Sequence, residues 1–177
     1  MTPDVDMQFE VSDKVVHPKH GAGQIVDVEQ LDLMAGFTYY YVITFNGQGL
    51  TVRVPVRKAG EIGVRPIMSD AKLATVLNTL RSLPAELPDD YKARQSQIRE
   101  RMRSGKPLQL AEAVRDLFWH RELAYLTKVD SELMSKAREV LAQEMAYATN
   151  SEVAEINARI DAALEGAKAR AVEELPA

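Results

Sequence analysis

The spacing of apolar residues changes once along the chain, close to Pro66. Before that residue, short runs rich in Val, Ile, Tyr, Phe and Thr predict strands, because branched and aromatic side chains favour extended backbone. Asn46-Gly47-Gln48-Gly49 separates two of these runs and is typical of a hairpin, since Asn and Gly tolerate positive φ. The strands are predicted at residues 14–17, 22–33, 37–45 and 50–54. Such short strands predict a small SH3-like or Tudor-like β-barrel.

After Pro66 the apolar residues recur at helical spacing. A first helix is predicted behind Ser69 or Asp70 as N-cap, and a fourth behind Asp130 or Ser131. The second and third helices are expected at about 90–103 and 108–125, and Val153, Ile156, Ile160 and Leu164 indicate a fifth. The fold class is therefore predicted to be α+β. A β-barrel in residues 1–66 precedes an all-α bundle of about five helices in 67–177, with the last ten or so residues frayed.

Composition excludes several classes of protein. The chain has no cysteine, which rules out disulfides and thiolate metal sites. Residues 1–10 carry three acids and no apolar run, unlike a signal peptide, and no stretch approaches the roughly 20 apolar residues of a membrane span. We expect a cytoplasmic protein that does not bind membranes.

Candidate catalytic and metal-binding residues are few. No phosphate-binding loop, dinucleotide motif or catalytic triad is found. His17 and His20 flank a predicted turn, but a zinc site needs three or four ligands and no third one is clustered with them. The predicted protein is therefore not an enzyme, and it holds no metal or cofactor.

Residues 91–106 are strongly basic, although the net charge of the whole chain is −4. They contain a single acid, Glu100, and six bases, namely Lys92, Arg94, Arg99, Arg101, Arg103 and Lys106. On a helix, Lys92, Arg99, Arg103 and Lys106 lie near one face, and Arg94 and Arg101 form a second row. Such rows can neutralise phosphates and release counterions, but a charge run of this kind is also typical of a solvated helix face.

Two aromatic residues accompany the basic segment. Tyr91 opens the second predicted helix, where an exposed ring could insert between bases in a minor groove or instead form a hydrophobic cap on the bundle. Trp119 is the only tryptophan, and its position in the third helix is typical of packing between helices.

Residues 9–23, Phe-Glu-Val-Ser-Asp-Lys-Val-Val-His-Pro-Lys-His-Gly-Ala-Gly, resemble the opening of the CarD family of bacterial transcription regulators. Residues 50–56 and 62–65 are similar to the end of that family's β module. In its helical module the similar segments are residues 104–105, 110–117 and 135–141, so the resemblance covers about residues 9–150. The β module alone also resembles the polymerase-binding part of transcription-repair coupling factor.

The resemblance implies that the β module is Tudor-like and docks on the β subunit of RNA polymerase, partly by strand pairing. An edge strand with free backbone groups is suited to this. Arg53 matches a charged contact residue of the family's module. The residues expected to contact polymerase are Thr51, Val52 and Arg53.

For the helical module, the resemblance implies contact with promoter DNA at the upstream edge of the melted bubble. There an aromatic residue, usually Trp, enters the minor groove and slows closure of the bubble. Tyr91 stands at this position here, whereas Trp119 belongs to another helix. Ala93 and Ser96 replace two of the family's usual basic residues. The expected contacts to the minor groove and phosphates are Tyr91, Lys92, Arg94, Arg99, Arg101 and Arg103.

The leading hypothesis is thus a monomeric transcription regulator that binds polymerase with its first part and promoter DNA with its second, stabilising the open complex. The alternative is a Tudor-like adaptor whose helical part serves partner binding or dimerisation without DNA contact. Weak, salt-independent binding to promoter DNA would favour the alternative, because phosphate contacts impose a dependence on salt.

Overall fold

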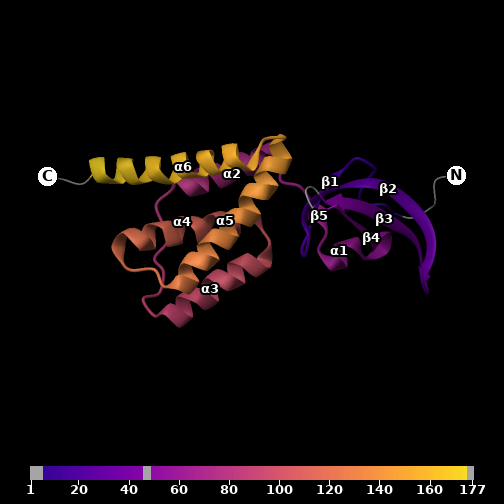
Figure 1. Ribbon diagram of the computed structural model, residues 1–177, viewed down its shortest axis with the longest axis horizontal. Helices are drawn as coiled ribbons and strands as arrows, with labels where there is room; N and C mark the ends of the chain where they lie inside the picture. The colour runs from indigo at the N-terminus through magenta and orange to yellow at the C-terminus, as the bar shows by residue number, and fades with distance from the viewer. Residues whose placement is uncertain (1–5, 46–48, 175–177) are drawn as a thin grey trace. The chain divides into compact units, whose positions relative to one another are not determined.

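The chain folds into two compact units, residues 1–67 and 68–177, in a computed structural model that describes residues 6–45 and 49–174 (Figure 1). Residues 46–48, which include most of the predicted hairpin turn, and residues 175–177 of the predicted frayed end lie outside the described residues.

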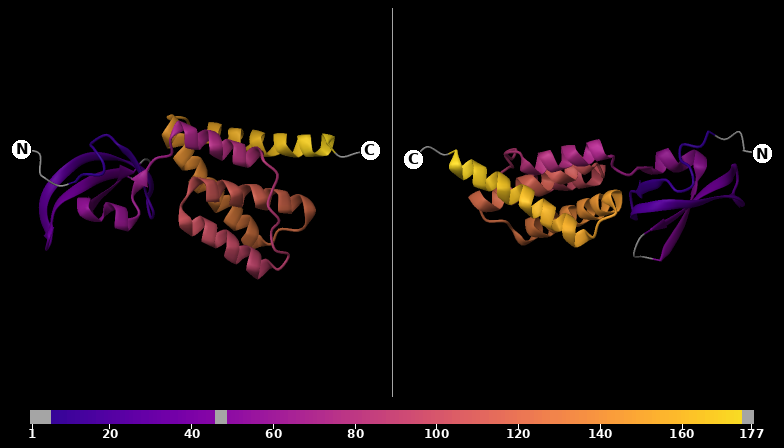
Figure 2. Two further views of the ribbon diagram at one scale, coloured as in Figure 1. Left: turned by 180° about the vertical axis from the view of Figure 1, so that it is seen from behind. Right: turned by 90° about the horizontal axis from the view of Figure 1, so that it is seen from above.

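The first unit is built on a five-stranded antiparallel sheet with the strand order β4-β3-β2-β1-β5, which Figure 2 shows to be strongly twisted. The predicted strands are confirmed, and a short fifth one is added. Within the described residues no ladder joins β4 to β5, so the Tudor-like sheet is open and not a closed barrel. Its strands are β1 (Lys14–His17), β2 (Gly21–Met34), β3 (Phe37–Phe45), β4 (Leu50–Pro55) and β5 (Arg65–Pro66).

The close approach of β2 and β3 explains why a glycine stands at position 23. A Cβ atom on Gly23 would lie 2.6 Å from the carbonyl oxygen of Thr44 and 2.8 Å from the ring of Phe45. Glycine is what lets β2 approach β3 at this point. The neighbouring residues Ile25 and Ile43 are fully buried in the core of the unit.

Pro55 ends β4, and the chain then turns through a 3₁₀ helix, η1 (Val56–Lys58), and the short helix α1 (Ala59–Ile62). Gly63 follows with φ of 95°, a left-handed conformation that glycine adopts without strain. The turn carries Val56 and Ala59 into the core and returns the chain to β5.

The second unit contains the five helices that were predicted. Ser69 caps the first of them, because its side chain accepts a hydrogen bond from the backbone N–H of Lys72. Gly105, with φ of 65°, ends the second. The helices are α2 (Asp70–Arg81), α3 (Tyr91–Ser104), α4 (Pro107–Leu123), α5 (Lys128–Thr149) and α6 (Val153–Glu173).

The predicted start of α5 is wrong. Thr127, and not Asp130 or Ser131, is its N-cap. The backbone N–H of Asp130 donates to the Thr127 hydroxyl at 3.1 Å, and the N–H of Thr127 donates to the Asp130 carboxylate at 3.0 Å. Asp130 is therefore the third helical residue of a capping box, in which two backbone donors are satisfied reciprocally.

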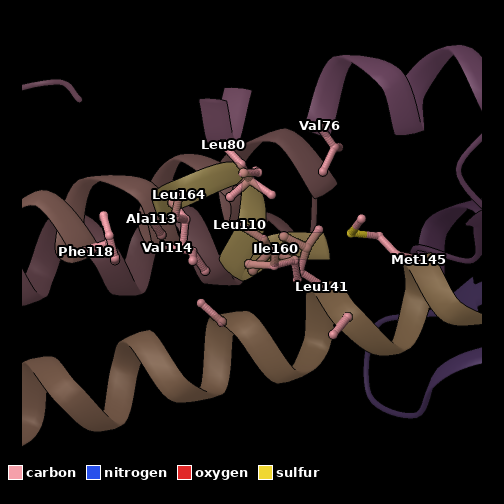
Figure 3. Packing of buried hydrophobic residues seen from close by; sticks show 14 of the residues in the cluster. Val76, Leu80, Leu110, Ala113, Val114, Phe118, Leu141, Met145, Ile160 and Leu164 are labelled. Carbon is pink, nitrogen blue, oxygen red and sulfur yellow. The ribbon is translucent and has the colours of Figure 1, made fainter. Parts of the chain in front are cut away.

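Helix α4 lies at the centre of the second unit and packs against α2, α3 and α5. Its residues Leu110, Val114 and Leu117 are almost fully buried. Figure 3 shows Leu80 of α2 and Ile160 of α6 close to the α4 side chains of this core.

Helix α6 begins with an exposed Val153 and continues to Glu173. Two contacts hold its later turns. Lys168 forms an ion pair with Glu122 of α4 at 2.7 Å, and the Arg170 guanidinium donates to the carbonyl of Arg81, the last residue of α2. The positive charge of Arg170 at the C-terminal end of α2 also interacts favourably with the dipole of α2.

Candidate functional surfaces

Strand β4 forms one edge of the sheet and carries the residues predicted to contact polymerase. It pairs with β3 on one side, and no strand among the described residues pairs with its other side. Thr51 and Arg53 are exposed, and Val52 is half-buried. The three residues therefore lie together on a strand that can accept a partner strand.

Arg53 makes a two-point ion pair with Glu29 of β2. Its Nε donates to Oε2 at 2.7 Å and its Nη2 to Oε1 at 3.3 Å. The hydrogen bond from Arg53 lowers the pKa of the Glu29 carboxyl. Because both side chains remain solvated, such a pair contributes little to stability. The pair orients the Arg53 guanidinium but is weak enough for the guanidinium to exchange Glu29 for another acidic group.

The outer face of α3 carries an exposed row of cations, Lys92, Arg99 and Arg103, with Lys106 exposed just beyond the helix. None of them forms an ion pair with a residue that the structure describes. Tyr91 begins the helix with half of its surface exposed, and the Lys92 ammonium lies 6.0 Å from its ring centre. This arrangement presents an aromatic ring and positive charge on one helix.

Arg94 is not part of that face, and its burial argues against the predicted phosphate contact. Only 3% of the residue is exposed, and its Nη2 lies 2.8 Å from the carboxylate of Asp130. Its Nη1 donates to the backbone carbonyls of Pro88 and Asp89, at 2.9 and 3.0 Å. The guanidinium is fully engaged inside the protein and cannot reach a nucleic acid.

Arg101 likewise points inward. Its Nη1 donates to Asp116 of α4 at 2.7 Å, and Arg115 binds the other oxygen of the same carboxylate at 2.7 Å. Arg101 therefore connects α3 to α4, and this engagement argues against its predicted contact with DNA. The two basic rows lie on opposite sides of the helix, so only one of them could face solvent.

Asp130 is the centre of a buried polar network that joins α3 to the start of α5. Besides the Arg94 guanidinium, its carboxylate accepts hydrogen bonds from the N–H and hydroxyl of Thr127. Gln95 also donates to the Thr127 hydroxyl at 3.1 Å. Burial opposes ionisation of the Asp130 carboxyl, but these donors outweigh it and lower its pKa.

Two exposed apolar side chains that the sequence interpretation missed lie where α4 ends: Leu123 is its last residue, and Tyr125 is in the connection to α5. Leu123 is 83% exposed and Tyr125 is 90% exposed. The backbone around them is nevertheless anchored: the N–H of Ala124 donates to the carbonyl of His120 at 2.8 Å, and Leu126 is buried. Helical periodicity had assigned Tyr125 to the end of α4.

The two histidines of the β1–β2 turn lie 4.7 Å apart, measured between ring centres. Nδ1 of His17 accepts the backbone N–H of Lys19, and burial, followed by the positive charges nearby, lowers the pKa of His17. No group of three potential metal ligands occurs among the described residues. These contacts organise the turn between two strands.

Comparison with known proteins assigns both units. Residues 9–68 match the model of the CarD-like/TRCF RID domain, and residues 75–161 match that of the CarD C-terminal domain. A relative from Bacillus subtilis (strain 168), named "Putative transcription factor YdeB", is 26% identical over 137 residues, which are 77% of this chain and 90% of the relative. No helix in the described part of the chain is long and apolar enough to cross a bilayer.

The β-rich and helical units thus match, in order, the two domains of a class of transcription factors, which is not a class of enzymes. The chain belongs to the CarD family. Its function is transcription regulation, and its first domain is of a kind that interacts with RNA polymerase.

Replacing Asp130 by Asn is expected to lower the free energy of unfolding of the helical unit by about 3–5 kcal/mol, because the Arg94 charge loses its buried counterion. Unfolding in urea, followed by the fluorescence of Trp119, measures this loss. A lowered pKa means that the Asp130 carboxylate stabilises the fold above about pH 4 and that this contribution is lost as the pH falls. The difference between wild type and variant should therefore shrink in acid.

The matched control is Asp161→Asn, which removes the ion pair with Arg138 on the partly exposed surface between α5 and α6. That variant should lose at most about 1 kcal/mol. Equal losses for the two variants would contradict a special role of the buried network.

Proposed function

We propose that this protein docks on the β subunit of RNA polymerase through the edge of β4 and contacts promoter DNA at the upstream edge of the melted bubble through α3. The expected result is a stabilised open complex. The observation that carries the proposal is the division of the exposed features between the units: an open strand edge with Arg53, and a helix bearing Tyr91 and an unpaired row of cations.

The docking half rests on β4. A partner strand on this edge would gain backbone hydrogen bonds, and side chains alternating along β4 would supply specificity. Thr51 and Arg53 alternate with Val52, so the first two face one side of the sheet and the third faces the other. Arg53 can then exchange Glu29 for an acidic group on polymerase.

The DNA half rests on α3. Lys92, Arg99 and Arg103 can each neutralise a phosphate, and Tyr91 is the first residue of the same helix. A ring that enters the minor groove only when the neighbouring base pairs are melted binds the open state more tightly than the closed one. The protein would therefore shift the equilibrium toward the open complex by this difference in affinity.

Arg53→Glu is expected to lower the affinity for polymerase at least about thirtyfold, the size of effect that a hot-spot charge produces at an interface. Binding of the purified variant to RNA polymerase, measured by biolayer interferometry, tests this. The fold should be unchanged, because the pair with Glu29 is exposed.

The control is a charge swap, Arg53→Glu combined with Glu29→Arg. It restores the pair within the sheet but not the positive charge on β4. If the swap recovers polymerase binding, then Arg53 acts only through Glu29, and the docking assignment fails.

Tyr91→Ala is expected to shorten the lifetime of the open complex at least about fivefold, because stacking of one base on an aromatic ring contributes about 1–3 kcal/mol. Polymerase binding should not change. The measurement is the dissociation rate of preformed open complexes after addition of a competitor, with Leu83→Ala as an exposed apolar control from the preceding loop.

The adaptor remains a second candidate, and the inward orientation of Arg94 and Arg101 favours it, since two of the predicted cations are withdrawn. The double variant Arg99→Ala, Arg103→Ala separates the two candidates. A DNA-binding protein should lose about 2 from the slope of log affinity against log salt concentration, roughly 1 for each phosphate contact. For an adaptor, neither form shows a salt slope on promoter DNA with polymerase present.

A further inference from the structure

We infer that Tyr125, on the connection between α4 and α5, is a second aromatic contact to nucleic acid beside Tyr91. This inference rests on the proposed DNA contact of α3 and extends it to a second segment of the chain. It starts from the buried network of Arg94, Asp130 and Thr127, which links the two segments.

The network fixes the positions of both tyrosines. Arg94 donates to the carbonyls of Pro88 and Asp89, three and two residues before Tyr91, and it also binds Asp130. Asp130 in turn holds Thr127, two residues after Tyr125. Figures 1 and 2 show the start of α3 and the start of α5 side by side at one end of the helical unit. The two tyrosines therefore belong to neighbouring segments at one end of the helical unit.

The exposure of Tyr125 is not a consequence of a loose backbone. Leu126 is buried, Ala124 donates to the end of α4, and Thr127 caps α5, so the residues on both sides are held. In the β unit, by contrast, Tyr40 and Tyr41 are almost fully buried. Keeping a tyrosine 90% exposed at an anchored position forgoes the burial that usually stabilises such a ring.

Each ring has a lysine close to it in the sequence that can contact a phosphate. Lys92 follows Tyr91, and Lys128 begins α5 with 90% of its side chain exposed. Exposed acids lie close by as well: Asp89 and Asp90 precede Tyr91, and Asp90 accepts the N–H of Ala93 as the cap of α3. Glu122 binds Lys168, and Glu132 lies 3.8 Å from Lys128.

The size of the apolar patch also distinguishes between partners. A stable protein interface buries about 800 Å² on each side, about twice what one aromatic ring and one leucine can supply. A nucleic-acid base needs a single ring, because stacking on one aromatic side chain already gives useful affinity. Tyr125 with Leu123 is therefore suited to an unstacked base or an exposed base step, and not to a second copy of the chain.

The test places a photo-crosslinking residue, p-benzoylphenylalanine, at position 125 in the full-length chain, bound to RNA polymerase on a promoter with a labelled upstream bubble edge. Parallel samples carry it at position 91 and at position 83, an exposed apolar position in a different loop. The expected result is crosslinking to DNA from positions 91 and 125, at nucleotides close to each other, and none from position 83.

Each other outcome has a separate meaning. Crosslinking to DNA from position 91 but not from 125 overturns this inference and leaves the proposed function intact. Crosslinking from 125 only to a polymerase subunit or to a second copy of the chain assigns the loop to a protein and also overturns it. If neither 91 nor 125 reaches DNA while polymerase is bound, the proposed DNA contact itself fails.

Substitution then tests whether the contact matters. Tyr125→Ala should shorten the open-complex lifetime at least about fivefold, and Tyr125→Phe should retain most of it, because stacking needs the ring and not the hydroxyl. The thermal unfolding midpoint of both variants should equal that of wild type, since the side chain is exposed. An unchanged lifetime for Tyr125→Ala would overturn the inference.

Discussion

The helical unit depends on one buried ion pair, that of Arg94 with Asp130. Removing two charges from water is costly, and the pair is tolerable only because almost every donor and acceptor is satisfied. Thr127 donates two further hydrogen bonds to the carboxylate, and the carbonyls of Pro88 and Asp89 accept hydrogen bonds from the guanidinium. Such a network has one good geometry, so it fixes how α3 meets α5 more narrowly than a sliding apolar contact would. Both exposed tyrosines take their positions from it.

In helix α3, polar contacts take the place of most of the apolar packing that usually holds a helix. Only Ile98 is a buried apolar residue of the helix, whereas Arg94 and Gln95, also buried, make polar contacts. With Arg101 bound to Asp116 of α4, polar groups hold α3 from both neighbouring helices. The opposite face is thereby left free to carry cations, because it contributes nothing to packing. A helix with an exposed row of cations on one face is thus attached to its own protein by charged groups on the other.

Several features of the fold could be predicted from the sequence, since they depend on neighbouring residues. Runs of branched and aromatic residues predict the strands, helical spacing predicts the helices, and Ser69 is one of two candidates for the cap of the first helix. The site could be predicted less well. Arg94 and Arg99 have the same chemistry, and spacing shows that they lie on opposite faces but not which face is buried. That depends on Asp130, 36 residues away. Tyr125 was missed because spacing alone extended α4 by two residues.

The open edge of β4 has a consequence for the free protein. An unpaired strand offers the same backbone groups to any extended chain, including another molecule of its own kind. The shortness of β4, the missing N–H of Pro55 and the charged pair of Arg53 with Glu29 all make such self-recognition less favourable. These safeguards are local, whereas full protection would come from occupancy of the edge. The ratio of this chain to its polymerase in the cell would then influence its solubility as well as its activity.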